Sequence, residues 1–309
     1  MMNIVVGEKE TNLRAVQYFS ETLFWLPEHR GMYASNFTFE FPFAPPGWLQ
    51  KLNVGETVTH FDWLSRTIRS WSWAESKVYA TNYPDKVWIL RQGKGEISCA
   101  GRDGTYDGRF LTLLTVNDGK ITHIRDYFDS IAMYRAIGVK LPVFKYGAPA
   151  AESMPDREPV PDLSGDEEAV CRQLKDTLSK FVAMDFWEDA EINANDIVHE
   201  LPFAPDDMPK RYEGKAYDAL NAWISGNCLE WKTYPGTILY VTDEEGVFFI
   251  ESGGTGYMSW TGVKGHYQQR ELSFLRTEQG YVKEFHEYFN MTNKFNSINV
   301  SIPTFPYLY

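Results

Sequence analysis

An acidic residue near the end of each half of the chain has the setting of a buried acid–base group. Side chains alternate along a strand, so Asp126 in Ile124-Arg-Asp-Tyr-Phe128 shares a face with two large apolar residues. Glu287 does the same in Phe285-His-Glu-Tyr-Phe289. An ionised carboxyl on an apolar face is costly unless it is paired or its pKa rises, and a raised pKa suits a general acid or base near neutral pH. The alternatives are an acid at a solvent-facing rim or one neutralised by an arginine.

Three further residue types stand where they would assist such an acid. Tyr106 and Tyr267 each precede an acid by twenty residues, at the start of the strand that hairpins back to it. Their hydroxyls are candidates to donate to a substrate carbonyl or to the carboxylate, and the alternative is a ring that only packs. His60 lies three residues before Trp63, so the two share a face of an expected helix.

The two halves of the chain are copies of each other. Phe39-Glu-Phe-Pro-Phe-Ala-Pro45 returns as His199-Glu-Leu-Pro-Phe-Ala-Pro205, an offset of 160, and Asp126-Tyr-Phe returns as Glu287-Tyr-Phe, an offset of 161. Trp63 has its counterpart in Trp223, but the position of His60 falls on Leu220 or a neighbour. Register kept over such a length indicates a duplicated domain. Either the first copy alone is fully catalytic, or the two sites differ in task.

The length of 309 residues accommodates two domains of ordinary size. We expect a first domain over residues 1–142, a proline-rich linker over 143–163 and a second domain over 164–309. In each copy, apolar residues first recur with the spacing of a helix and then, further along the chain, at every second position, as in strands. The first copy predicts helices over 8–24 and 56–70, a strand over 36–43, and strands over 77–80, 86–97, 105–116 and 121–129, with a hairpin turn at Asn117-Asp-Gly-Lys120. Helices followed by an antiparallel meander are typical of an α+β fold with a pocket at one end of the curved sheet.

Composition narrows the classes of partner. Aromatic residues make up 16% of the chain, enough to fill cores or line apolar pockets. A net charge of −12 argues against a nucleic-acid partner, which needs a clustered basic surface. Three cysteines without short spacing predict neither a disulfide framework nor a zinc site. The start lacks the pattern of a signal peptide and no window has the length of a membrane span, so we expect no membrane association and a cytoplasmic protein.

Several motifs of the first copy resemble one family. The chain is similar to two tandem copies of the phenazine-biosynthesis PhzA/PhzB type, within the nuclear-transport-factor-2-like (NTF2-like) superfamily that includes SnoaL and ketosteroid isomerase. The resemblance rests on these segments, in order: His60-x-x-Trp63, Trp71-Ser-Trp73, Pro84-Asp-Lys-Val-Trp88, Gly93-Lys-Gly95, Asn117-Asp-Gly-Lys120, Arg125-Asp-Tyr-Phe and Tyr134-Arg-Ala-Ile-Gly138. The second copy is similar more weakly, through Glu287-Tyr-Phe-Asn290, Tyr267 and Trp223.

This resemblance implies an α+β cone with one pocket per unit, no metal and no cofactor. It also implies an intramolecular pseudo-dimer, with a homodimer as a further possibility. The family's acid–base glutamate corresponds to Asp126 and Glu287, its histidine to His60 and its tyrosine to Tyr106 and Tyr267. The family's serine falls on Leu64 with Ser65 beside it, and Arg30 is the nearest counterpart of its arginine.

The leading hypothesis is a cofactor-independent enzyme of specialised metabolism that condenses or cyclises a small amino-carbonyl compound through an imine. Asp126 and Glu287 would shuttle protons, with His60 as a further catalytic group. Substrate would contact the residues Tyr106, Tyr267, Trp63, Trp223, Ser65 and Arg30. Two alternatives stay open. One is a SnoaL-type cyclase, dehydratase or isomerase of a polyketide or terpenoid, and the other is a non-catalytic protein that binds a small molecule.

Overall fold

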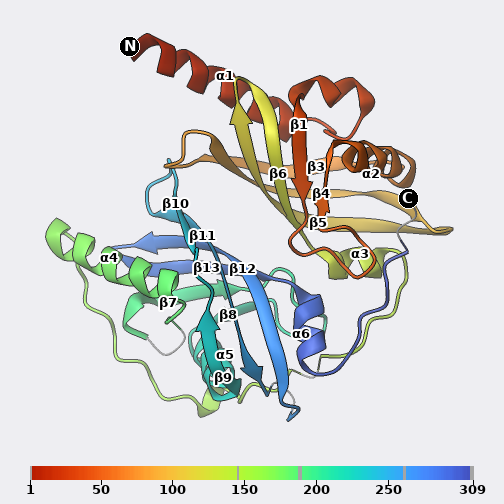
Figure 1. Cartoon of the computed structure of the whole chain (residues 1–309). Coiled ribbons are helices and arrows are strands. Elements are labelled where there is room, and N and C mark those ends of the chain that lie inside the picture. Colours follow the sequence, from red (N-terminus) through yellow and green to blue (C-terminus); the bar gives the residue numbers. More distant parts are fainter. Residues whose placement is uncertain (1, 145, 187–189, 260–261, 307–309) are drawn as a thin grey trace. The chain divides into compact units, whose positions relative to one another are not determined.

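The chain folds into two compact units with the same order of elements (Figure 1). A computed structural model describes residues 2–144, 146–186, 190–259 and 262–306. The first unit runs to Leu141 and includes the C-terminal segment that begins at Pro303, and the second unit runs from Pro142 to Ile302. The duplication seen in the sequence is thus a duplication of folding units.

The first unit has helices followed by a six-stranded sheet. Its elements are α1 (Met2–Glu21), a 3₁₀ turn (Pro27–Met32), β1 (Tyr33–Glu40), β2 (Lys51–Leu52), α2 (Val54–Thr67), β3 (Ser72–Ala80), β4 (Lys86–Cys99), β5 (Arg102–Asn117), β6 (Lys120–Phe128) and α3 (Ser130–Ala136). The strand order is β2-β1-β6-β5-β4-β3. The expected antiparallel meander is confirmed for β3 to β6, whereas β1 pairs with β6 in parallel, so the sheet is mixed.

The second unit repeats this plan. Its elements are a 3₁₀ turn (Ala151–Ser153), α4 (Glu167–Ala183), a 3₁₀ turn (Ala190–Ile192), β7 (Asn193–Glu200), β8 (Arg211–Glu213), α5 (Lys215–Asn227), β9 (Cys228–Thr233), β10 (Ile238–Val241), β11 (Val247–Met258), β12 (Gly265–Glu278), β13 (Tyr281–Phe289) and α6 (Met291–Ser297). The sheet order is β10-β11-β12-β13-β7-β8, with β9 also paired to β11. The expected α+β class and the tandem arrangement of two units are confirmed.

Local chemistry sets the ends of the elements that carry the site. A capping box starts α2, because Asn53 accepts from the Glu56 backbone N–H at 3.0 Å and Glu56 accepts from that of Asn53 at 2.9 Å. The turn between β5 and β6 has positive φ at Asp118 (50°) and Gly119 (70°), as a two-residue hairpin turn requires. The hairpin turn sets the pairing of β5 with β6, the strand that carries Asp126.

The proline-rich stretch is not a free linker. Phe144 is fully buried and makes edge contacts with Trp223 and Phe295, at centroid distances of 6.4 and 5.7 Å. Arg157 donates to Asp218 of α5 at 2.5 Å. The two units divide between Leu141 and Pro142, and Phe144 and Arg157 of the proline-rich stretch contact helix α5 of the second unit. Residues 303–306 belong to the first unit.

Candidate functional site

A pocket in the first unit lies between the sheet, α2 and the C-terminal segment. It encloses about 700 Å³ of space free of protein atoms, part of it open to solvent. Twelve of its twenty lining residues are Phe, Trp or Tyr, so a ligand there would meet mainly flat apolar surfaces. The polar residues of the lining are few: His60, Thr67, Tyr106 and Asp126, with Cys99 as the one thiol.

Asp126 projects from β6 into this pocket. Strand alternation places it on the same face as Phe128, and its side chain is buried in the protein. Thr112, its partner across β5, donates a hydrogen bond to Oδ1 of Asp126 at 2.6 Å. Burial raises the pKa of Asp126 to about 6, against the opposing effects of the Arg91 charge and of the Thr112 hydroxyl. The carboxyl can therefore hold and release a proton near neutral pH.

Arg91 supplies the positive charge behind the pocket wall. Its Nη2 donates to Oγ1 of Thr112 at 3.1 Å, so Thr112 connects the guanidinium to Asp126. The guanidinium carbon lies 4.3 Å from the ring centre of Trp73 and 4.7 Å from that of Phe19, in cation–π contact. The sequence analysis allowed for an arginine that neutralises the acid but did not identify Arg91. The alternation of side chains along β4, which points Arg91 inward, could have indicated it.

His60 lies in the pocket on α2, as its spacing predicted. Its ring stacks on Trp63 at a centroid distance of 5.7 Å and lies 5.1 Å from the ring of Phe41. Burial lowers the pKa of His60 to about 3, so the imidazole is neutral at physiological pH. It can offer or accept a hydrogen bond there, but it does not carry charge.

Tyr106 also lines the pocket, at the start of β5. Its hydroxyl donates to the backbone carbonyl of Asp129 at 3.3 Å. Burial, followed by the nearby charges of Asp129 and Asp126, raises the pKa of Tyr106, so the phenol stays a proton donor. The structure thus brings Asp126, His60, Trp63 and Tyr106 to one cavity.

Two predicted contacts lie outside this pocket. Ser65 is exposed, and its hydroxyl donates to the carbonyl of Phe61 one turn earlier in α2, at 2.9 Å. Leu64 occupies the pocket wall instead. Arg30 forms an ion pair with Asp62 and is not among the lining residues. Neither residue lines this pocket, because helix periodicity turns Ser65 away from the sheet and Asp62 engages Arg30.

Residues remote in the sequence complete the pocket and were not anticipated. Trp48, in the loop after β1, makes an edge contact with Trp63 at 5.4 Å and a tilted contact with Phe305 at 5.5 Å. Phe305 itself comes from the C-terminal segment, whose Pro303 carbonyl accepts a hydrogen bond from the Tyr134 hydroxyl. The recurring proline motif marked the loop, but nothing in the sequence marked the return of the C-terminal segment.

In the second unit, Glu287 is buried on β13 as predicted, beside a histidine that sequence reasoning missed. His199 on β7 has its Nε2 3.5 Å from Oε2 of Glu287, and its ring stacks on Phe285 at 4.3 Å. Burial lowers the pKa of His199, against the opposing effect of Glu287. In the repeat His199 corresponds to Phe39, and this alignment could have indicated that His199 faces inward. The second unit thus has a histidine on a strand where the first has one on a helix.

The other predicted residues of the second unit are buried in different surroundings. Tyr267 lies beside Trp231 at a centroid distance of 5.9 Å, and burial together with Glu271 and Glu287 raises its pKa. Trp223 packs against Phe144 and against Tyr146, the latter at 4.9 Å. Trp223 therefore contacts the proline-rich segment, whereas its counterpart Trp63 lines the pocket of the first unit.

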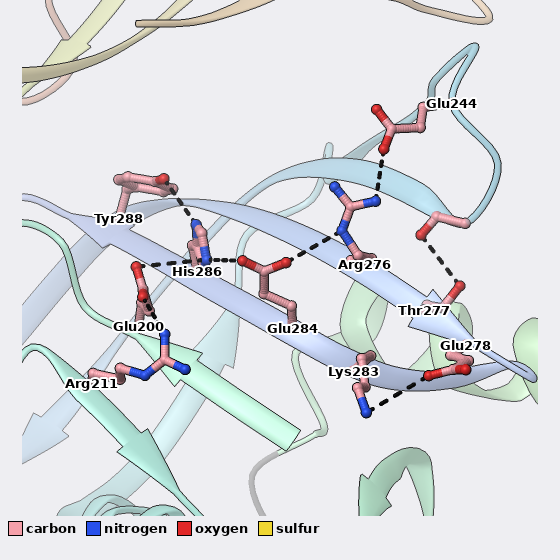
Figure 2. A network of polar contacts seen from close by, with 11 residues as sticks. Glu200, Arg211, Glu244, Arg276, Thr277, Glu278, Lys283, Glu284, His286 and Tyr288 are labelled. Carbon is pink, nitrogen blue, oxygen red and sulfur yellow. Dashed lines mark hydrogen bonds and ion pairs between the residues drawn. The ribbon is translucent and has the colours of Figure 1, made fainter. Parts of the chain in front are cut away.

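A polar network braces the opposite face of β13 (Figure 2). His286 lies 2.7 Å from Glu284 and 3.7 Å from Glu200 of β7. Arg276 of β12 joins Glu284 at 3.3 Å and Glu244 at 2.7 Å. These pairs connect the strands whose other face carries Glu287 and His199, and so they hold the site residues in register.

Comparisons with known proteins agree with the resemblance seen in the sequence. Residues 53–150 match the family described as phenazine biosynthesis protein A/B. The chain is 31% identical over 93 residues to the phenazine biosynthesis protein PhzB of Pseudomonas fluorescens, covering 29% of this chain and 57% of that protein. It is 27% identical over 130 residues to the uncharacterized protein YesE of Bacillus subtilis, covering 41% of this chain and 86% of YesE. The chain spans about half the length of the PhzA and PhzB relatives it matches.

Solved structures also match about half of the chain. A phenazine biosynthesis-related protein, PhzB2 of Pseudomonas aeruginosa, aligns with a TM-score of 0.42 and 21% identity, over 48% of this chain and 91% of that protein. A putative SnoaL-like polyketide cyclase from Jannaschia sp. CCS1 aligns with a TM-score of 0.34 and 18% identity, over 43% and 94%.

Two negative findings apply to the residues that the structure describes. Among them, no helix combines the length and apolar character needed to cross a membrane. Nor do three or more His, Cys, Asp or Glu side chains of this part of the chain gather as they would around a metal ion. The expected resemblance to the PhzA/PhzB family is confirmed, and it is carried by residues 53–150, most of which lie in the first unit.

Proposed function

We propose that the protein is a cofactor-independent acid–base enzyme that condenses or cyclises a small amino-carbonyl compound through an imine. The observation that supports this most is Asp126, a carboxyl with a pKa of about 6 that points into an aromatic pocket. A group with such a pKa populates both protonation states near pH 6, as a proton shuttle must. The similarity of residues 53–150 to phenazine biosynthesis proteins supports a biosynthetic role.

Imine formation needs a proton delivered to the departing hydroxyl and another removed from nitrogen. Asp126 can do both in turn, because the carboxyl regains its starting state after the two transfers. In this proposal Tyr106, a neutral donor, exchanges its hydrogen bond to the Asp129 carbonyl for one to the substrate carbonyl, and the neutral imidazole of His60 holds the amine. The aromatic walls exclude water and orient the two reactants, which supplies much of the rate gain.

Self-condensation of aminoacetone, the smallest α-aminoketone, tests the proposal. We expect the wild-type chain to accelerate formation of the dihydropyrazine product, followed by mass spectrometry. Asp126→Asn and Glu287→Gln should each lower turnover, and the double variant should lose about 100-fold or more. Asp107→Asn is the matched control, since Asp107 is an exposed acid on the outer face of the strand that carries Tyr106. Unchanged turnover in both single variants and in the double variant would end the proposal.

A SnoaL-type isomerase or cyclase is the second candidate, and the pocket lining favours it. Twelve aromatic side chains around one acid suit a flat polycyclic or terpenoid substrate better than a small polar one. A double-bond isomerisation assay with an unsaturated polycyclic ketone separates the two. Hydrogen exchange at the carbon next to the ketone, lost in Asp126→Asn, would favour this candidate if the protein also fails to turn over aminoacetone.

A further inference from the structure

The two units differ at two positions that line the pocket of the first unit. On β5 the first unit has Phe110, and the offset of 161 places Glu271 of β12 at that position. On α3 it has Met133, and the same offset places Lys294 of α6 there. Phe110 and Met133 both line the first pocket. The second unit therefore replaces an apolar pair by an acid and a base, which is a correlated change at one site.

The second unit thereby buries two carboxyls on one face of its sheet. Ser273 of β12 pairs across the sheet with Glu287, and Glu271 lies two residues earlier, so the two acids are diagonal neighbours on adjacent strands. Glu271, Glu287 and Lys294 are each at most 5% exposed. Nζ of Lys294 also lies 3.8 Å from the ring centre of Phe289. Lys294 is thus held at the apolar end of a two-carboxyl site.

Charge balance separates the protonation states of the two acids. Glu271 interacts with Glu287 from β13, Lys294 from α6 and Tyr267 from its own strand, and His199 from β7 lies beside Glu287. One ammonium group can compensate one buried carboxylate, and His199 is kept neutral by burial. Burial and the charge of Glu287 raise the pKa of Glu271 well above its ordinary value, with Lys294 opposing. The raised pKa favours the protonated form of Glu271.

Polar groups without partners mark the same face as a site for a ligand. Gln269, two residues from Glu271 and fully buried, has an Nε2 with no hydrogen-bond partner in the described part of the chain, although its Oε1 accepts from Asn293 at 3.5 Å. Nδ1 of His199 has no hydrogen-bond partner among the described residues, whereas its Nε2 lies 3.5 Å from Oε2 of Glu287. A buried ion pair that served stability alone would need neither a second acid nor an unmatched amide donor.

We propose that the second unit holds its own two-carboxyl site, in which Glu271 is the proton donor and Glu287 the proton acceptor for an amino-carbonyl substrate. This inference rests on the proposed function and deepens it: the first unit works with one acid, the second with two. Lys294 is a positioning residue whose ammonium group is placed to balance the charge of one of the two carboxyls. Gln269 is placed to donate to the carbonyl oxygen of the substrate.

The proton balance of the reaction closes with these two groups. As the substrate nitrogen attacks the carbonyl carbon, Glu271 protonates the oxygen and Glu287 takes a proton from nitrogen. The carbinolamine then loses water: Glu287 returns its proton to the departing hydroxyl, and Glu271 takes the remaining proton from nitrogen. A C–N bond has formed, a C–O bond has broken, one water has left, and both carboxyls are back in their starting states.

Carboxyl ¹³C chemical shifts of glutamate-labelled full-length protein test the proton assignment directly. We expect Glu271 to give the shift of a carboxylic acid at pH 8 and Glu287 that of a carboxylate, with exposed Glu167 as the ionised reference. Two ionised signals, or a proton on Glu287 instead of Glu271, would overturn the proposal. This measurement does not depend on turnover.

Kinetics of the second site are read in an Asp126→Asn background with aminoacetone as probe. Glu271→Gln should lower the remaining turnover about 100-fold and remove the loss of rate at high pH. The double change Glu271→Phe with Lys294→Met copies the first unit's packing, and it should lose the same activity while the protein stays folded. Undiminished turnover in both variants would overturn the proposal. No activity in the wild-type chain, with Glu271 protonated, would instead reject the proposed reaction and retain the proton assignment.

Discussion

Arg91 and Asp126 interact through a single intervening hydroxyl. The guanidinium donates to Thr112 at 3.1 Å, and Thr112 donates to the carboxylate at 2.6 Å. Both charged groups are almost fully buried, and burial also lowers the pKa of Arg91 to about 10. The acidity of Asp126 is thus set by two opposing effects, desolvation and a nearby positive charge, and each can be changed separately.

Replacing Arg91 should move the activity profile to higher pH. In Arg91→Met the positive charge is gone, so the pKa of Asp126 should rise further and the acid limb of kcat/KM should shift upward by about 1 pH unit. Arg91→Lys keeps the charge and serves as the control, with a smaller shift. If the acid limb of the kcat/KM profile lies at the same pH in the wild type and in Arg91→Met, the pKa of Asp126 does not determine this limb.

Asp126 should lower stability at neutral pH. Its folded pKa of about 6 lies above the ordinary value of 3.8, so the folded state binds this proton more tightly and loses stability as the pH rises from about 4 to 6. Asp126→Asn removes this dependence. The difference in unfolding free energy, variant minus wild type, should therefore increase by up to about 3 kcal/mol as the pH rises from 4 to 7. Urea unfolding across this range checks it, and parallel pH curves would contradict it.

His60 should not titrate in the physiological range. With a folded pKa of about 3 against an ordinary 6.5, it destabilises the fold as the pH falls below 6.5. Its imidazole NMR signals should stay constant from pH 8 to pH 5. The variant His60→Leu copies Leu220 of the second unit. Its unfolding free energy relative to the wild type should increase by about 2 kcal/mol as the pH falls from 8 to 5. A midpoint near 6.5 in the NMR titration would refute the assignment of a neutral ring.

The C-terminal segment should be part of the first site. Phe305 is buried against Trp48 and Tyr134, at centroid distances of 5.5 and 5.2 Å, and lines the pocket. Phe305→Ala should cost about 3 to 5 kcal/mol of stability in the first unit and raise KM for the probe. Thr304→Ala, at an exposed neighbour, is the control. An unchanged KM in Phe305→Ala would place the segment outside the binding site.

Ser65 and Arg30 should be dispensable for catalysis. Ser65→Ala loses a hydrogen bond within α2, and Arg30→Met loses a pair with the half-exposed Asp62. Each should leave turnover within about twofold and change stability by about 1 kcal/mol or less, as expected of partly exposed polar contacts. A large fall in kcat or a rise in KM in either variant would show that the replaced residue does contact the substrate.

The sequence by itself determined which strand positions face inward. Side-chain alternation is a local property, so the inward orientation of Asp126 and Glu287 follows from a few flanking residues, and the hairpin turn at 117–120 fixes the register. The helix spacing likewise predicted that His60 and Trp63 share a face. The repeat added the α+β order of elements and the tandem units, because it acts as an internal alignment.

Only the tertiary structure decided which distant groups meet at these acids. Arg91 lies on β4, two strands away from Asp126, and His199 and Glu271 lie on the two strands that flank that of Glu287. The return of Phe305 to the first unit depends on the path of the whole chain. Burial and the resulting pKa of Asp126 also depend on the sum of all surrounding atoms, which no local pattern contains. The sequence could therefore place an acid on an inward face, but its proton affinity is a property of the folded environment.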